Sequence, residues 1–337
     1  MGRSSRLHRF AAATIVLLLS TTVALALAEA ATRLFFPAFD PSGQFDFDHE
    51  VGPLMLARPG TVTRQVKNTG DYDVEIRINR RGLRDARDIA EATPADLIVV
   101  GDSVAWGWGI EESRRFSNLI EAATAIRTFN LSCPANLQGY ADLLAYARSL
   151  GAKPGRVVIA VSMETDLRAY APAPSDGTAS APQSLLEPVK SWLDSHSAAY
   201  LFAVTTIHRT PWLNALAVRA GLIVPSLEGI WGNHYSAEII AGSADKLQEI
   251  ARGQPTLIVL VPSRGLWAGN NRPDEDHVHR ALVAALEKRG LDVLDLRPLL
   301  EAGGAPLVYH FANDGHWNER GHRLAAEAIV ARLKGGT

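Results

Sequence analysis

The stretch Leu97–Gly109, LIVVGDSVAWGWG, decides the fold. Its first four residues are apolar, include β-branched side chains and are followed by glycine, which is typical of a strand buried on both faces. Ser103 comes just past the carboxyl end of this strand, where open α/β sheets place their ligands. We therefore expect a buried strand that presents Ser103 as a nucleophile.

The size and composition of the chain bound what it can be. Its 337 residues, 47% of them hydrophobic, suffice for one substantial core with appendages or for two small domains, and exclude a disordered chain. The 34 basic and 36 acidic residues nearly balance, so no overall field indicates nucleic acid as a partner. The single cysteine, Cys133, excludes an internal disulfide and a thiolate metal cluster.

The N-terminus predicts a membrane anchor. A basic segment precedes Phe10–Ala28, about 19 residues without a charge, which as a helix come close to the roughly 30 Å of the hydrocarbon core. The basic flank places the first residues in the cytoplasm. We expect residues 1–32 to form a cytoplasmic tip and a single-pass anchor, with the rest of the chain on the extracytoplasmic side. The basic segment holds Arg3, Arg6, His8 and Arg9.

Two other interpretations of the N-terminus stay open. Small residues at Ala26, Ala28 and Ala30 offer cleavage sites, so the segment can be a signal peptide that leaves a secreted protein. A buried helix of a soluble protein is the third interpretation, and the terminal position and charge asymmetry disfavour it. The length of the apolar stretch favours the uncleaved anchor.

Residues 33–92 indicate a small β-rich lead-in. Within it Val74, Ile76 and Ile78 alternate with charged residues, as in a half-exposed strand. The basic cluster that follows is interpreted as a solvated surface paired with Asp85 and Asp88, and alternatively as a site for an anionic substrate group. This cluster consists of Arg80, Arg81, Arg84 and Arg87.

Residues 93–337 alternate apolar runs with helical patterns, as parallel strands joined by crossover helices do. One helical pattern ends at Gly151, and another begins at Pro273 and ends at Gly290. The predicted fold class is therefore α/β, a parallel sheet of about five strands flanked by helices. The predicted strands are Leu97–Val100, Arg127–Leu131, Arg156–Ser162, Thr256–Val261 and Leu291–Leu296.

A helical insertion is predicted at about residues 171–235. Its first part, Ala171–Ser184, is rich in Ala, Pro and Ser and is typical of a mobile surface loop. Its second part, Leu185–Val224, predicts two or three helices. These helices can form a lid or substrate wall, or can simply pack against the core.

The Asp-Gly-His-Trp motif at residues 314–317 supplies the partner that a serine nucleophile needs. A hydroxyl is a weak nucleophile until a base takes its proton, and an imidazole beside a carboxylate can do so. Asp314 and His316 are two residues apart, so one short loop can bring both to Ser103, and Asn318 can cap the helix that fixes this loop. This arrangement predicts a serine esterase.

Other kinds of site were weighed against this one. His310, His316 and His322 can instead ligate a metal, although no carboxylate cage accompanies them. Gly101–Ala105 nearly fits an α/β-hydrolase elbow, but such enzymes separate their acid and histidine widely, and no nucleotide-binding glycine pattern is present. Asp274–His279 is better explained as a helix start than as a metal site.

Gly101-Asp102-Ser103 after the first strand, together with Asp-Gly-His-Trp-Asn at residues 314–318, resembles the SGNH (GDSL-type) hydrolase family. The Asn79–Arg84 lead-in and the Gly-Trp-Gly at residues 107–109 are similar to bacterial, membrane-anchored members, some of them associated with surface polysaccharides. The resemblance covers about residues 75–335. It implies an SGNH-like (flavodoxin-like) sheet.

The resemblance also implies roles for single residues. Ser103 would be the nucleophile, His316 the base and Asp314 its orienting acid, although many relatives place the acid where this chain has Asn313. The Ser103 backbone N–H would be one donor of the oxyanion hole.

The two other oxyanion blocks depart from the family pattern. The second has Ala135 at the glycine position, which a backbone donor tolerates, and the third has Thr165 where asparagine is usual. A threonine hydroxyl reaches less far than an amide, and Asn136 can compensate. The expected oxyanion and substrate-binding residues are Ala135, Asn136, Thr165 and Asp166.

Three functions stay open at this point. The first is an exported serine esterase that cleaves acyl esters, acetyl groups on surface glycans among them, through an acyl-serine intermediate. The second is a glycan O-acetyltransferase with the same triad, and the third is a non-catalytic glycan-binding or assembly protein. The proposed chemistry needs no metal or organic cofactor, and the expected partners are an acyl-ester substrate and the membrane.

Overall fold

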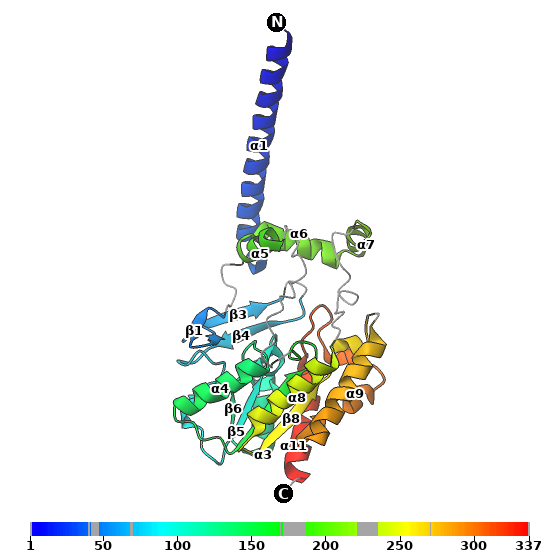
Figure 1. Cartoon of the computed structure of the whole chain (residues 1–337). Coiled ribbons are helices and arrows are strands. Elements are labelled where there is room, and N and C mark those ends of the chain that lie inside the picture. The colour runs from blue at the N-terminus through cyan, green and yellow to red at the C-terminus, as the bar shows by residue number, and fades with distance from the viewer. Residues whose placement is uncertain are drawn as a thin grey trace. The chain divides into compact units, whose positions relative to one another are not determined.

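A computed structural model of the chain, drawn in Figure 1, describes residues 2–39, 41, 47–67, 70–168, 170, 187–220, 235–269 and 271–335. The chain divides into two compact units. The first comprises residues 1–44 and 178–223, and the second comprises residues 45–177 and 224–337. The surface loop predicted at Ala171–Ser184 lies outside the described residues.

The described part of the first unit is helical. Its long helix α1 (Gly2–Phe35) contains one segment, Ala12–Phe35, that is long and apolar enough to cross a membrane. The predicted insertion supplies three helices to this same unit. They are α5 (Glu187–His196), α6 (Ala198–Arg209) and α7 (Pro211–Arg219), and the short 3-10 helix η1 (Pro37–Phe39) follows α1.

A five-stranded parallel sheet forms the centre of the second unit, as the sequence predicts. Its order, β6-β5-β7-β8-β9, is the doubly wound order in which the first strand lies between the second and the third. Val99 of β5 accordingly pairs with Asn130 of β6 and with Val158 of β7. The strands are β5 (Leu97–Gly101), β6 (Thr128–Asn130), β7 (Arg156–Ser162), β8 (Thr256–Val261) and β9 (Asp292–Asp295).

Helices cover both faces of this sheet, so its strands are apolar on both sides. In β7, Val157 and Ile159 join the core beneath one set of helices, and Val158 and Ala160 join the core beneath the other. The first set is α4 (Leu137–Ser149), α8 (Ala237–Ala251) and α9 (Arg272–Lys288). The second set is α3 (Phe116–Thr124) and α11 (Glu319–Gly335).

Local signals explain where the main helices begin and end. The Asn136 side chain accepts hydrogen bonds from two backbone N–H groups of the first turn of α4, and Gly151 takes the left-handed conformation just past its end. Pro273 lies in the first turn of α9, and Gly290 follows it at a positive φ. Short elements complete the unit: α2 (Ser103–Trp106), α10 (Arg297–Glu301), η3 (Ile89–Glu91), η4 (Glu112–Arg114), η5 (Arg264–Leu266) and η6 (Pro306–Tyr309).

The lead-in consists of two small antiparallel hairpins. β1 (His49–Val51) pairs with β2 (Leu54–Leu56), and β3 (Val62–Val66) pairs with β4 (Asp73–Arg77). The apolar residues of β4 face a small core that is closed by Trp106, whose side chain is fully buried. The hairpin β3–β4 is thereby packed on α2, the helix that follows β5.

The basic cluster of the lead-in is only partly the solvated surface that the sequence predicts. Arg80 and Arg81 pair with Asp88, and Arg87 pairs with Asp85 and Glu121. Arg84 departs from the prediction because it is fully buried. Its guanidinium donates to the carbonyls of Gly107 and Ile110, so it holds the glycine-rich loop after Ser103.

Candidate active site

The sheet topology places Ser103 at its switch point. Ser103 is the first residue of α2, which follows the first strand of the sheet, β5, and Asp102 caps this short helix by accepting from the Val104 N–H at 2.8 Å. The turn from strand to helix is tight. A Cβ on Gly101 would lie 2.6 Å from the Ala105 Cβ and 2.9 Å from a backbone oxygen of β7, so a side chain there would push the serine away from the sheet.

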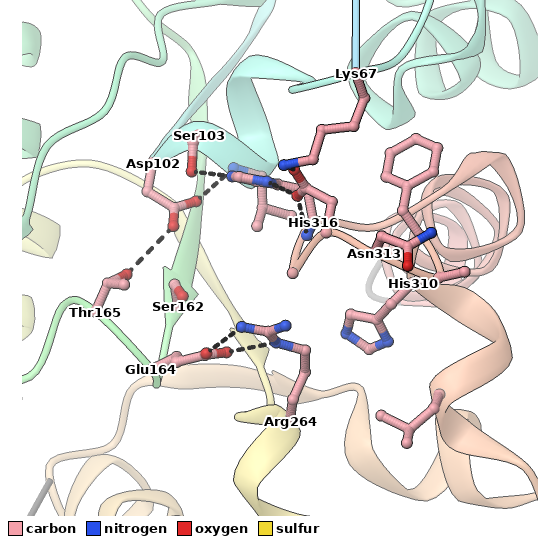
Figure 2. A pocket seen from close by; sticks show the side chains of 16 residues that line it. Lys67, Asp102, Ser103, Ser162, Glu164, Thr165, Arg264, His310, Asn313 and His316 are labelled. Carbon is pink, nitrogen blue, oxygen red and sulfur yellow. Dashed lines mark hydrogen bonds and ion pairs between the residues drawn. The ribbon is translucent and has the colours of Figure 1, made fainter. Parts of the chain in front are cut away.

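The structure brings the three residues of the predicted triad together. Ser103 Oγ lies 2.8 Å from His316 Nε2, and His316 Nδ1 lies 2.5 Å from Asp314 Oδ1. Asp314 also accepts from the His316 backbone N–H at 3.0 Å, which fixes the turn between them. Figure 2 shows the imidazole of His316 beside the hydroxyl of Ser103. This is the order of contacts that activation of a serine by a base requires.

The loop that carries Asp314 and His316 is held at both of its ends. Before it, Phe311 donates its backbone N–H to the His316 carbonyl, and His310 forms a β-bridge with Trp317. After it, the Asn318 side chain accepts from backbone N–H groups in the first turn of α11. The prediction that Asn318 caps this helix is confirmed.

Two residues of the lead-in hairpin also contact the triad carboxylate. The Lys67 ammonium lies 3.0 Å from Asp314 Oδ2, and the Tyr72 hydroxyl donates to the same oxygen at 3.2 Å. Tyr72 in turn accepts a hydrogen bond from the Trp108 indole at 2.8 Å. One carboxylate oxygen of Asp314 therefore faces His316, and the other is held by the hairpin.

This hairpin contact was not anticipated from the sequence. Lys67 follows a strand whose alternating pattern gives only its exposed and buried faces, and Tyr72 is separated from Asp314 by 242 residues. No local pattern reports a pairing at that distance. Asn313 adds to the contact between the hairpin and the terminal loop, because its side chain and its backbone N–H both donate to Asp71.

Electrostatics keep the triad carboxylate ionised. Burial opposes ionisation of Asp314, but the hydrogen bond and charge of His316 and the Lys67 ammonium hold the pKa of this carboxyl well below its usual range. Burial of the Tyr72 phenol, together with the Asp314 charge, raises the pKa of Tyr72, so Tyr72 stays a neutral donor. The acid therefore offers a permanent negative charge to the imidazole.

Trp108 fixes the plane of the imidazole. Its indole stacks on the His316 ring at 5.3 Å between centroids and 19° between planes. The indole is itself oriented by the hydrogen bond to Tyr72 and by contact with Trp106 at 5.9 Å. Trp108 of the Gly-Trp-Gly motif thus lies against the ring of His316.

A cavity of about 530 Å³ opens in front of Ser103 and His316. Figure 2 shows side chains from opposite ends of the sequence lining it. The residues that line it are Lys67, Asp102, Ser103, Val104, Ser162, Glu164, Thr165, Arg264, Leu307, His310, Phe311, Ala312, Asn313, Asp314, Gly315 and His316. Its volume is large enough for a small acyl ester together with part of the group that carries it.

The four predicted oxyanion and substrate-binding residues divide into two groups. Thr165 lines the cavity, and its hydroxyl donates to Asp102 at 3.4 Å. Ala135, Asn136 and Asp166 are not among the lining residues. The Asn136 side chain is engaged in capping α4.

Asp166 supports the loop that carries Thr165. It is fully buried and accepts from the Tyr140 hydroxyl at 2.7 Å and from the Ser162 backbone N–H at 2.8 Å. Burial and the nearby charge of Asp102 raise its pKa well above the usual range, and Tyr140 and Ser162 oppose this only in part. Asp166 therefore joins α4 to the end of β7 through the hydrogen bonds that it accepts.

An ion pair on the opposite wall of the cavity was also missed by sequence reasoning. The Arg264 guanidinium lies 2.7 Å from a carboxylate oxygen of Glu164, and both side chains are mostly buried. A Cβ at Gly315 would lie 2.5 Å from this guanidinium, so the glycine between Asp314 and His316 is what allows Arg264 to approach the catalytic loop. Burial, followed by the Arg264 charge, lowers the pKa of His310 to about 3.

The three histidines weighed as metal ligands have different surroundings. His316 contacts Ser103, whereas His310 and His322 are buried on either side of the terminal loop. Within the described residues, no group of three or more His, Cys, Asp or Glu side chains could hold a metal ion. His279, in the acidic cluster at the start of α9, pairs instead with Asp295 at 2.9 Å.

Residues 232–336 match a family model described as SGNH hydrolase-like domain, acetyltransferase AlgX. The C-terminal part of the chain is thus similar to SGNH hydrolase-like domains. This match confirms the resemblance drawn from the motifs, and it includes Asp314 and His316 but not Ser103. No curated protein matches the chain.

Several solved structures are similar to the chain at low sequence identity. A lipolytic protein of the G-D-S-L family from Veillonella parvula is 14% identical, covers 71% of this chain and 98% of its own, and has a TM-score of 0.41. A lipase/acylhydrolase from Enterococcus faecalis is 14% identical (71% and 96% covered, TM-score 0.40). The esterase EstA from Pseudoalteromonas is 11% identical (72% and 97% covered, TM-score 0.37).

Proposed function

We propose that the protein is an exported, membrane-tethered serine enzyme of SGNH type that cleaves acyl esters through an acyl-serine intermediate. The observation that carries this proposal is the continuous chain of contacts from Ser103 through His316 to Asp314, with distances of 2.8 Å and 2.5 Å, at the wall of a cavity. The predicted roles follow from it: Ser103 is the nucleophile, His316 the base and Asp314 the orienting acid.

The first half of the reaction forms the acyl-serine. Ser103 Oγ attacks the ester carbonyl carbon while its proton passes to His316 Nε2. Collapse of the tetrahedral intermediate breaks the bond to the alcohol oxygen, and the imidazolium returns its proton to that oxygen, so the alcohol leaves neutral. Asp314 stays ionised throughout and stabilises the imidazolium.

The oxyanion of that intermediate needs donors at the same wall of the cavity. The Ser103 backbone N–H, at the first position of α2, is one, and the Thr165 hydroxyl, which lines the cavity at the sequence position where the family usually has asparagine, is the second. The Thr165 hydroxyl has two weak acceptors of its own, Asp102 and Asp166, each at 3.4 Å. To donate to an oxyanion it has to turn away from these carboxylates.

Hydrolysis of an aryl acetate by the full-length protein tests the nucleophile. Ser103→Ala is expected to lower kcat by at least about 10³-fold, because no attacking group remains. A serine-directed phosphonate probe should label the wild type and leave the variant unlabelled. Ser263→Ala, at a serine that caps a neighbouring short helix, serves as the matched control. Equal turnover in wild type and Ser103→Ala, with no labelling of either, would favour a non-catalytic binding protein.

A second candidate reaction is transfer of the acyl group to a sugar hydroxyl. The matched family is described as an acetyltransferase, and an acyl-serine can be resolved by any hydroxyl that His316 deprotonates. The two reactions share their first half and differ only in the acceptor. Mass spectrometry of the products, with an acetyl donor and a glycan acceptor present together, separates them. Acetylated glycan formed faster than free acetate identifies a transferase, and acetate alone identifies an esterase.

A further inference from the structure

The inserted helices are attached to the end of the apolar helix α1 by a partly buried carboxylate, Glu29. Glu29 of α1 accepts from the Ser197 hydroxyl at 2.8 Å and from the backbone N–H groups of Ala198 and Ala199, each at 3.0 Å. These are N–H groups of the first turn of α6, which have no partner within their own helix. Glu29 therefore caps α6 from a helix more than a hundred and sixty residues earlier in the chain.

Further contacts on both sides of Glu29 strengthen this attachment. Arg33, one turn later in α1, donates to Glu29 at 2.7 Å and to the carbonyl of His196, the last residue of α5, at 2.8 Å. Beyond the end of α1, the rings of Phe36 and Phe39 lie 4.9 Å and 5.2 Å from the ring of Phe202. The inserted helices and the end of α1 are thus one packed body.

This attachment determines the position along α1 at which the inserted helices lie. Glu29 is the first charged residue after Phe10–Ala28, so α6 begins where the uncharged stretch ends. In a membrane-spanning helix this is the boundary between hydrocarbon and headgroups. Figure 1 draws α6 lying across this end of α1.

Large apolar side chains are exposed on the two helices that flank α6. Val189 and Trp192, one turn apart on α5, are 54% and 59% exposed. Trp212 and Leu216, one turn apart on α7, are 67% and 58% exposed. Each pair shares one side of its helix, and tryptophan is the residue that favours the membrane interface. Leu34 and Phe35, at the adjoining end of α1, are 73% and 70% exposed.

We infer that α5, α6 and α7 form a membrane-interface platform, with Trp192 and Trp212 seated among the lipid headgroups of the membrane that α1 crosses. This inference rests on the membrane tether of the proposed function. The platform is a second contact with the lipid, made by helices inserted between the third and fourth strands of the sheet domain. Its binding is of the kind made by amphipathic helices that lie in the interface.

Tryptophan fluorescence separates the platform from the anchor, because α1 contains no tryptophan. The full-length protein is reconstituted in phosphatidylcholine–phosphatidylglycerol vesicles in which part of the lipid carries bromine, either near the headgroup or deep in the acyl chain. Shallow bromine is expected to quench the wild type more strongly than deep bromine. Trp192→Phe/Trp212→Phe should lose more than half of the quenchable emission, and Trp267→Phe, in the sheet domain, should retain it.

A second variant tests the attachment itself. Glu29→Ala removes the cap of α6 but leaves the uncharged stretch of α1 intact, so the protein should still float with the vesicles after a carbonate wash while its quenching falls. Glu50→Ala, at an exposed residue of β1, should behave like the wild type.

Several outcomes would overturn the inference. Quenching that is unchanged in the double tryptophan variant means that the two rings do not reach lipid. Quenching that disappears as the amount of protein per vesicle rises means that a second copy of the chain covers the same face. Wild-type protein that is washed off the vesicles by carbonate removes the membrane tether as well. Esterase activity of that washed protein would still uphold the catalytic part of the proposed function.

Discussion

At the scale of single residues, the predicted triad combines two residues that are close in the sequence with one that is far from both. Asp314 and His316 are two residues apart and need only a turn, whereas Ser103 reaches them through the sheet. The carboxylate then receives Lys67 and Tyr72 from the lead-in hairpin. Positioning of the acid is therefore divided between the catalytic loop and a segment outside the sheet.

Lys67→Met tests the charge held against Asp314. Without the ammonium, Asp314 loses one of the charges that lower its pKa, so the acid limb of the kcat pH profile, which reports the coupled Asp314–His316 pair, should move to higher pH. The plateau above that limb should change by less than about threefold, and Lys67→Arg should restore the wild-type profile. Lys288→Met, at an exposed lysine of α9, is the control. An unchanged profile in Lys67→Met would contradict a role for this cation.

Thr165 is the second residue for which the geometry makes a prediction. Thr165→Val removes the hydroxyl and should lower kcat for aryl acetate by roughly 10- to 100-fold with little change in KM, because the donor acts on the oxyanion rather than on the bound ester. Thr165→Asn supplies a longer amide donor and should equal or exceed the wild type. Steady-state kinetics of both variants check this, and a Thr165→Val enzyme with wild-type kcat would exclude Thr165 from the oxyanion hole.

At the scale of elements, the helices α3 and α11 meet over a buried histidine. His322 of α11 accepts from the Phe116 backbone N–H at 3.3 Å and stacks on the Phe116 ring at 5.8 Å. Burial, and then the charges of Arg115 and Arg84, lower the pKa of His322 to about 3. The contact between the two helices therefore requires a neutral imidazole.

This buried histidine predicts acid sensitivity of the fold. The unfolded chain binds a proton at His322 near pH 6.5 and the folded chain only near pH 3, so the free energy of unfolding falls as the pH is lowered between these values. The loss is about 5 kcal/mol at most. His322→Asn keeps an acceptor for Phe116 and should flatten this dependence, as measured by urea unfolding from pH 7 to pH 4.

The matched control for that series is His277→Asn, at an exposed position of α9. It should keep the wild-type dependence on pH. His310, whose pKa is also lowered to about 3, should leave part of the acid sensitivity in the His322→Asn variant. Equal slopes in wild type and His322→Asn would show that His322 takes up no proton on unfolding.

At the scale of the whole molecule, the chain has two compact units, one with a helix that can cross a membrane and one with the sheet and the cavity. The proposed tether predicts that the mature protein keeps residues 1–32. A tag at the N-terminus should stay on the membrane fraction after a carbonate wash, and protease added outside the cytoplasmic membrane should digest the sheet domain. Loss of the tag, with a soluble sheet domain, would indicate a cleaved signal peptide instead.

The sequence by itself determined the elements whose causes are local. Apolar runs that alternate with helical patterns predicted the five strands, and caps and stops predicted α4, α9 and α11. The motifs at residues 101–103 and 314–318 carried the family resemblance, and the family match over residues 232–336 includes the second of them. The catalytic roles assigned to these motifs stay predictions. The half-exposed strand before Asn79 was also predictable from its alternation.

Only the tertiary structure decided which distant groups share a site. Lys67 and Tyr72 reach Asp314, Arg264 pairs with Glu164 on one wall of the cavity, and Glu29 caps α6, because packing brings together segments that no periodic pattern connects. Burial of Arg84 likewise depends on the loop that closes over it. A local sequence pattern indicates the strand or helix to which a residue belongs. A contact between residues a hundred or more positions apart depends instead on the packing energy of the whole fold.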